Sequence, residues 1–233
     1  MTPPARPKRT DHADVTVADL ATAVRPGRCA VVTMELQQGI VGRRSAFAQL
    51  AAAAEDGQIV RHAGELVRAA RRAGVPVVHC TAELRADGAG SAANCRLLAA
   101  ALRHPDHVTV GSPGAALVPE LGPEPSDLVC PRLHGVSPFT GTPLDRWLRN
   151  LGVTAVVVAG VSLNVGILGL VVEAVNLGYE VVVVEDAVCG VPETYARAVL
   201  DHTVSLLATV APVADVAAHW EGWTGFGADL PRG

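Results

Sequence analysis

The chain carries five short, nearly continuous runs of apolar residues, and the first of them, Cys29–Met34, lies between Gly27 and Glu35. A run of this length without polar alternation is typical of a strand that is buried on both faces. The other runs are Val75–Cys80, Asp127–Cys130, Ala155–Ala159 and Glu180–Val184. The pattern therefore predicts five strands of one buried sheet.

The stretches between these runs have the length and spacing of helices. They are Ala46–Glu55, Gly57–Ala73, Asn94–Arg103, Pro143–Asn150, Asn164–Leu177 and Pro192–Thr209. Alternation of buried strands with helices predicts an α/β fold of three layers, with a mostly parallel sheet and helices on both faces. Residues 1–25 are Pro-rich and then weakly helical, so we expect an N-terminal arm, followed by a single domain at 26–233. The long excursion over residues 84–125 has little regular pattern, and loops of such length are usually functional or mobile.

Composition and charge disfavour several classes of function. The 233 residues are 49% hydrophobic with a formal net charge of −4, and the basic residues are scattered, so we expect no nucleic-acid partner. No apolar stretch is long enough to span a membrane and no signal peptide is readable, which favours a cytoplasmic protein. The five cysteines have no metal-type spacing, so we expect reduced thiols, no metal and no cofactor. Cys80 and Cys189 lie near strand ends without the helix N-terminus that activates a thiol, so neither is expected to be a nucleophile.

Ligands of parallel sheets bind beyond the carboxyl ends of the strands, and candidate chemistry follows three of the predicted strands there. Glu35 comes directly after the first strand, where a carboxylate needs partners or stays protonated, as suits a general acid or base. It would look the same if it only ended the strand at the solvent edge. Arg132 and His134 follow the strand Asp127–Cys130. Either side chain binds anions and His134 also transfers protons, although an ordinary polar loop has the same composition.

The segment Gly160–Gly166 joins a predicted strand to a predicted helix. Asn164 is a candidate N-cap of that helix, and the first free N–H groups of the helix would then face the site. Such donors can hold an oxyanion or a carboxylate. An ordinary capped helix has the same sequence pattern, so the residues alone leave both interpretations open.

Three segments taken together resemble the isochorismatase-like hydrolase superfamily. MELQQG resembles the Asp-x-Gln signature after its first strand, while SPFTGTPLDRWLRNLGVTAVVVAG and GVSLNVGILGLVVEAVNLGYEVVVVEDAV resemble two later blocks, over about residues 28–213 in all. The resemblance implies a six-stranded parallel sheet, a small-molecule substrate, a homodimer or larger homo-oligomer, and a cis peptide at Val161–Ser162. From their places in these motifs we expect substrate-binding residues at Gln37, Phe139, Val161, Ser162, Asn164 and Gly166.

Most members of that superfamily are cysteine hydrolases that act on amides with an Asp, a Lys and a Cys, and this chain departs from all three. The acid is Glu35, and the lysine position, four residues before Ser137, is Leu133; the one lysine in the sequence is Lys8. The cysteine position is Gly166. A branch of the superfamily that cleaves the vinyl ether of isochorismate also has glycine there, and it protonates the substrate with the acid after the first strand.

These departures lead to two hypotheses. The first is a hydrolase of a small organic acid, such as a vinyl ether of secondary metabolism, that acts without a cysteine nucleophile. Glu35 would donate the proton, Arg132 or His134 would orient an anionic group, and the amides of residues 164–166 would hold an oxygen. The second is a non-catalytic relative that binds a ligand or a partner subunit. A cavity at Glu35 favours the first hypothesis, and an ion pair between Glu35 and Arg132 without a cavity favours the second.

Overall fold

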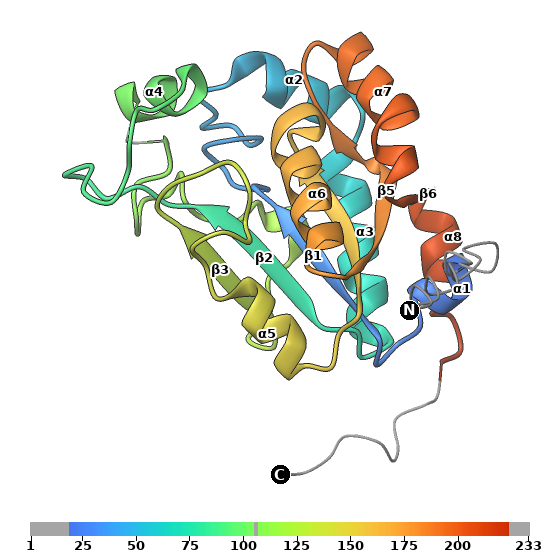
Figure 1. The fold of residues 1–233 in the computed structure, drawn as a ribbon. Coiled ribbons are helices and arrows are strands. Elements are labelled where there is room, and N and C mark those ends of the chain that lie inside the picture. Colours follow the sequence, from blue (N-terminus) through green and yellow to red (C-terminus); the bar gives the residue numbers. More distant parts are fainter. Residues whose placement is uncertain (1–18, 105–106, 224–233) are drawn as a thin grey trace, which may run out of the picture.

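The computed structural model describes residues 19–104 and 107–223, and its centre is a six-stranded sheet (Figure 1). The strands are β1 (Cys29–Met34), β2 (Val77–Ala82), β3 (Leu128–Arg132), β4 (Ala155–Val161), β5 (Glu180–Cys189) and β6 (Thr209–Ala211). They lie in the order β3-β2-β1-β4-β5-β6, and every neighbouring pair is parallel. The predicted α/β fold with a mostly parallel sheet is confirmed.

Helices cover both faces of this sheet, which confirms the three layers (Figure 1). One face packs against α1 (Leu20–Ala23), α2 (Ala48–Asp56), α3 (Ile59–Arg72) and α8 (Val213–Ala218). The other face packs against α5 (Leu144–Asn150), α6 (Leu168–Asn176) and α7 (Glu193–His202). The helix α4 (Arg96–Arg103) lies beyond the carboxyl end of β2, away from both layers (Figure 1). In the described part of the chain, no helix has the length and hydropathy needed to cross a bilayer.

The two central strands explain why the sheet can be read from the sequence. Every residue of β1 and of β4 is buried. Neighbouring residues of β1 point to opposite faces, so that Val31 joins one core cluster and Val32 joins the other. The order of the strands reverses between β1 and β4, and this reversal creates the crevice in which ligands of such sheets bind.

Several element boundaries differ from the predicted ones. Both β2 and β3 run two residues further than their apolar runs indicated, to Ala82 and Arg132, and thus reach the site directly. The predicted helix Pro192–Thr209 is wrong in its last part, because α7 ends at His202 and is followed by η5 (Val204–Leu206) and then by β6. This edge strand has three residues and only Ala211 is buried, so its apolar run merges with that of the preceding helix.

The predicted N-terminal arm is described only from residue 19 onward; residues 1–18 lie outside the described part. Residues 19–25 pack on the domain, since Ala23 and Val24 are buried and the indole N–H of Trp220 donates to the carbonyl of Val24 at 2.6 Å. This part of the segment therefore belongs to the domain.

Candidate functional site

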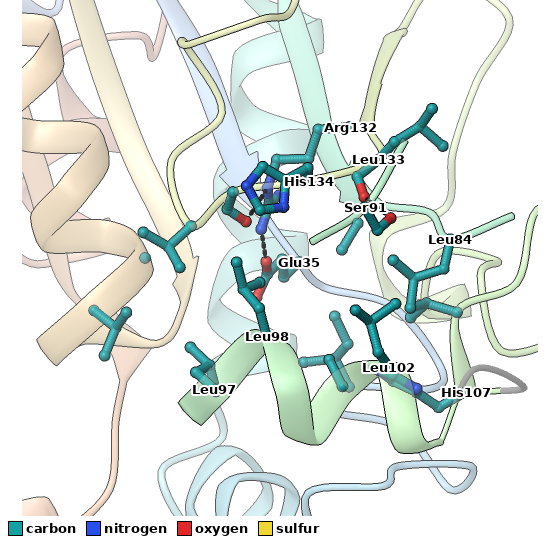
Figure 2. A pocket seen from close by; sticks show the side chains of 18 of the residues that line it. Glu35, Leu84, Ser91, Leu97, Leu98, Leu102, His107, Arg132, Leu133 and His134 are labelled. Carbon is teal, nitrogen blue, oxygen red and sulfur yellow. Dashed lines mark hydrogen bonds and ion pairs between the residues drawn. The ribbon is translucent and has the colours of Figure 1, made fainter. Parts of the chain in front are cut away.

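A cavity of about 90 Å³ lies at the carboxyl ends of β1, β3 and β4 (Figure 2). Glu35, Arg132, Ser162 and Gly166 line it from the strand ends, and the excursion after β2 closes it from the opposite side with α4. The volume is several times what one water molecule needs, and it is smaller than the roughly 150 Å³ of a cavity that binds benzene. The cavity thus occupies the crevice that the strand order defines, and a ligand with an aromatic ring would extend from it through its open side.

The polar end of the cavity is an ion pair between Glu35 and Arg132, in which Nη2 of Arg132 donates to Oε1 of Glu35 (Figure 2). Glu35 has a φ of 54°, a left-handed conformation that is uncommon for residues other than glycine and gathers at functional sites. Its side chain is 18% exposed, whereas that of Arg132 is 5% exposed. The carboxylate is therefore the more accessible partner, with the guanidinium behind it.

The guanidinium of Arg132 is only partly satisfied by the protein. Its Nε donates to the carbonyl of Gly135 at 3.1 Å, and Nη2 is taken by Glu35. Its Nη1 is buried and finds no hydrogen-bond partner among the described residues. A buried donor without an acceptor is costly, so an oxygen that reached Nη1 would be strongly favoured.

His134 lies at the rim of the same cavity. Its side chain is exposed, and its Nδ1 accepts from the amide of Ala92 at a long 3.4 Å. Leu133, which stands at the superfamily's lysine position, also lines the cavity and is 40% exposed. The cation that contacts the acid is thus Arg132, one residue before the lysine position, and His134 stands further out.

Gly166 faces the cavity floor, where the side chain of Met34 takes the adjoining space. A Cβ at position 166 would lie 2.7 Å from Cε and 3.2 Å from Sδ of Met34, which is itself fully buried. The methionine thus occupies the room that the side chain of a nucleophile would need. Among the described residues, no thiol lines this cavity.

Gln37 does not line the cavity, although we expected it to bind substrate. It is fully buried, and its amide donates to the carbonyls of Ala82 and Ala115, both at 2.9 Å. Its Oε1 accepts from the amide of Ala82 at 2.8 Å. The side chain therefore ties the end of β2 to the excursion and acts as a positioning residue.

Phe139 and Val161 also lie outside the lining. Phe139 is in the core, stacked on Tyr179 with ring centroids 5.9 Å apart, and Val161 is fully buried. The cis peptide that the resemblance implies at Val161–Ser162 is present. Ser162 follows it into the cavity lining.

The prediction that Asn164 caps a helix is wrong. The chain leaves β4 through a turn of π-helix, η4 (Leu163–Ile167), and the cap position is Ser162, whose side chain makes no capping bond. The side-chain amide of Asn164 instead donates through Nδ2 to the carbonyl of Val191 at 3.1 Å. The carbonyl of Ser162 already accepts from the N–H of Val165 and that of Ile167, so these two amides are not free for a ligand.

A pair of thiols, for which the sequence has no signal, lies beside the site without lining it. Cys80 and Cys130 are register partners in β2 and β3, and each is 1% exposed. The hydrogen bond with Cys130, together with burial, raises the pKa of Cys80, whereas the bond from Cys80 lowers the pKa of Cys130 to about 7. Burial raises the pKa of Cys189 to about 12.

His79, which precedes the end of β2, lies in the core and is fully buried. Its Nδ1 is 2.7 Å from the hydroxyl of Thr33, and its Nε2 is 3.3 Å from Oδ2 of Asp127. Burial lowers the pKa of His79, although Asp127 acts in the opposite direction. Across residues 19–104 and 107–223, no three His, Cys, Asp or Glu side chains are grouped to hold a metal ion.

A doubly wound parallel sheet with an acid after β1 and a cis peptide after β4 defines the class of isochorismatase-like α/β hydrolases. The family model for the isochorismatase domain matches residues 29–216, and the chain belongs to that family.

Named relatives agree with this assignment. The chain is 34% identical over 172 residues to ureidoacrylate amidohydrolase RutB of Methylobacterium radiotolerans, covering 68% of this chain and 66% of that protein. It is 30% identical over 196 residues to the uncharacterized isochorismatase family protein YecD of Escherichia coli O157:H7, covering 80% and 93%. An isochorismatase family protein of Burkholderia thailandensis superposes with a TM-score of 0.70 at 30% identity, covering 84% of this chain and 97% of its own.

Proposed function

We propose that this chain is a hydrolase that cleaves a small organic acid by acid–base chemistry at Glu35, without a thiol nucleophile. The observation that supports this most is that the Glu35–Arg132 pair lines a cavity in which Gly166 stands at the superfamily's cysteine position. Relatives named as amidohydrolases suggest amide hydrolysis. Since position 166 has no side chain and Met34 fills the adjoining space, we do not expect cysteine amidase activity.

In the ion pair Glu35 is a carboxylate, which must take up a proton before it can deliver one. An anionic substrate provides a route, because its carboxylate can replace Glu35 as the partner of Arg132. Glu35, no longer paired with the guanidinium, is then free to take up a proton from solvent. Substrate binding would thus convert Glu35 into a general acid.

The reaction that fits such an acid is hydrolysis of a vinyl ether. Glu35 transfers its proton to the terminal carbon of the double bond, and the electrons of that bond leave an oxocarbenium ion at the ether carbon. Water adds to this carbon and returns a proton to Glu35. The hemiketal then collapses to an alcohol and a keto acid, with Arg132 holding the carboxylate throughout. No covalent enzyme intermediate is needed.

A direct test uses isochorismate and 2-(benzyloxy)acrylate, two vinyl ethers that release pyruvate on hydrolysis. We expect turnover that falls by about 10²-fold or more in Glu35→Gln, the range of a lost general acid, and that survives treatment with iodoacetamide. Glu173→Gln is the control, because Glu173 lies on α6, where it accepts hydrogen bonds from Ser137 and Thr140 away from the cavity lining. Loss of activity on alkylation, with a covalent adduct, would contradict the proposal.

A second candidate function is non-catalytic binding of an organic acid. The ion pair favours it, because a Glu35 that remains on Arg132 with ligand bound has no proton to give. A protein that binds carboxylates but releases no pyruvate from either vinyl ether would have this function.

A further inference from the structure

We infer that the ligand of the Glu35–Arg132 cavity is a monocarboxylate with an apolar body, which Leu98 and Leu102 of α4 select. This inference rests on the proposed function for its view of Arg132 as the anion-binding group. It goes further by specifying the part of the ligand that does not react.

The helix α4 turns apolar side chains toward the cavity. This helix has no buried residue, yet its apolar residues Leu97, Leu98, Ala101 and Leu102 all line the cavity. Leu97 and Ala101 are four residues apart, as are Leu98 and Leu102, so the two pairs run side by side along one side of the helix. Figure 2 shows Leu98 beside Glu35 and Leu102 further along α4, on the side of Leu84. Leu98, Ala101 and Leu102 are only partly buried, with Leu102 packed in part against the core, so this face still presents apolar surface to a ligand in the cavity.

The facing wall is apolar as well. Ile40, Phe47, Leu84 and Val108 line it, and His107 closes it with an edge contact to Phe47 at 5.4 Å between ring centroids. Apart from His107, the ionisable side chains of the lining, Glu35, Arg132 and His134, lie together at the other end (Figure 2). The cavity therefore has one charged end and an apolar body, as a small-molecule site with few orienting groups should.

The charges of the lining determine how many carboxylates fit. Among the described residues that line the cavity, Arg132 is the one arginine, and Glu35 is the one carboxylate. A ligand with one carboxylate can thus be neutralised at Nη1 and Nη2. A second carboxylate beside Leu98 would find no arginine or lysine in the described lining, and such an unpaired charge is costly to bury. His134 lies at the exposed rim, and Nδ1 of His107 already contacts the carbonyl of His104. The lining thus disfavours diacids, isochorismate among them.

Binding of stable acids tests the inference without turnover. We expect calorimetric titration of the full chain to give binding of 3-phenylpropanoate, with 3-phenylpropanamide and glutarate weaker by about tenfold or more. Leu98→Gln and Leu102→Gln should each raise the Kd of 3-phenylpropanoate by about tenfold. Leu206→Gln is the matched control, because Leu206 is 81% exposed and is not a lining residue. Equal binding of glutarate, or unchanged binding in both α4 variants with folding intact, would overturn the inference.

Turnover separates failure of this inference from failure of the proposed function. If 2-(benzyloxy)acrylate is cleaved at least tenfold more efficiently than isochorismate, as judged by kcat/KM, both stand. Equal cleavage of the two ethers would support the hydrolase activity and refute the selection by α4. Selective binding of 3-phenylpropanoate without cleavage of either ether would support the ligand class and refute the hydrolase activity.

Discussion

The contact between Gly166 and Met34 allows a quantitative test of the cavity floor. A Cβ at position 166 would lie 2.7 Å from Cε of Met34, whereas carbon atoms in good contact are about 3.5–4.0 Å apart, so the methyl group has to move by roughly 1 Å. Because Cε is the end of a flexible side chain and can swing aside, we expect Gly166→Ala to suffer an overpacking cost at the lower end of the usual range, about 1 kcal/mol. The better helix propensity of alanine offsets about as much, so the free energy of unfolding should change little.

Met34→Leu removes the methyl group that causes the conflict, and as a swap of similar volume it should cost under about 1.5 kcal/mol by itself. The double variant is then expected to be more stable than the sum of the single changes by roughly 0.5–1 kcal/mol, at the lower end of the range seen for residues in contact. Urea unfolding of the four proteins measures this coupling, provided that the m value is unchanged.

Gly169→Ala is the matched control for this cycle. Gly169 lies on α6, and a Cβ there would meet the Cβ of Ser137 at 3.5 Å, an ordinary contact. The substitution should stabilise the protein by about 0.4–1 kcal/mol. Additivity of Gly166→Ala and Met34→Leu to within about 0.5 kcal/mol would show that Met34 does not occupy the space beside position 166.

Three further outcomes are expected. Gln37→Leu leaves the amide of Ala82 and two carbonyls without partners, so urea unfolding should show a loss of roughly 2–4 kcal/mol. Because burial lowers the pKa of His79, the unfolded chain binds a proton that the folded chain does not as the pH falls below about 6.5. Stability should then decline with a slope of up to about 1.4 kcal/mol per pH unit, a slope that His79→Gln removes. Iodoacetamide should leave Cys130 of the folded protein unmodified in mass spectra, since the residue is 1% exposed although its pKa is lowered to about 7 by the hydrogen bond from Cys80.

The parts of the fold that the sequence predicts are those in which a single physical effect dominates. The runs that became β1 and β4 are apolar throughout because both faces of a central parallel strand are buried. The edge strand β6 has no such pattern, since two of its three residues are half-buried. Its existence depends on pairing with β5, a contact far away in sequence.

The site divides in the same way. Glu35 and Arg132 could be placed because Glu35 follows β1 and Arg132 ends β3 in a parallel sheet, and these positions bring them to one edge. The roles of Gln37 and Asn164 could not be read, since an amide side chain has the same sequence signature whether it binds substrate or the backbone. The leucines of α4 did have a signal, a helical repeat within RLLAAALR, but where that face points is decided by the path of the excursion.

Exchange of partners at Arg132 leads to a last prediction. If a ligand carboxylate replaces Glu35, the free energy of the Glu35–Arg132 pair is lost in the complex and opposes binding. Glu35→Gln replaces the carboxylate that competes with the ligand for Arg132 by a neutral amide of the same shape. We therefore expect 3-phenylpropanoate to bind Glu35→Gln more tightly than the native chain by roughly 1–2 kcal/mol, about five- to thirtyfold in Kd. Arg132→Gln should lose the preference for acid over amide in both backgrounds. Weaker binding to Glu35→Gln would mean that Glu35 contacts the ligand directly and that no exchange occurs, and the route by which Glu35 becomes an acid would fail with it.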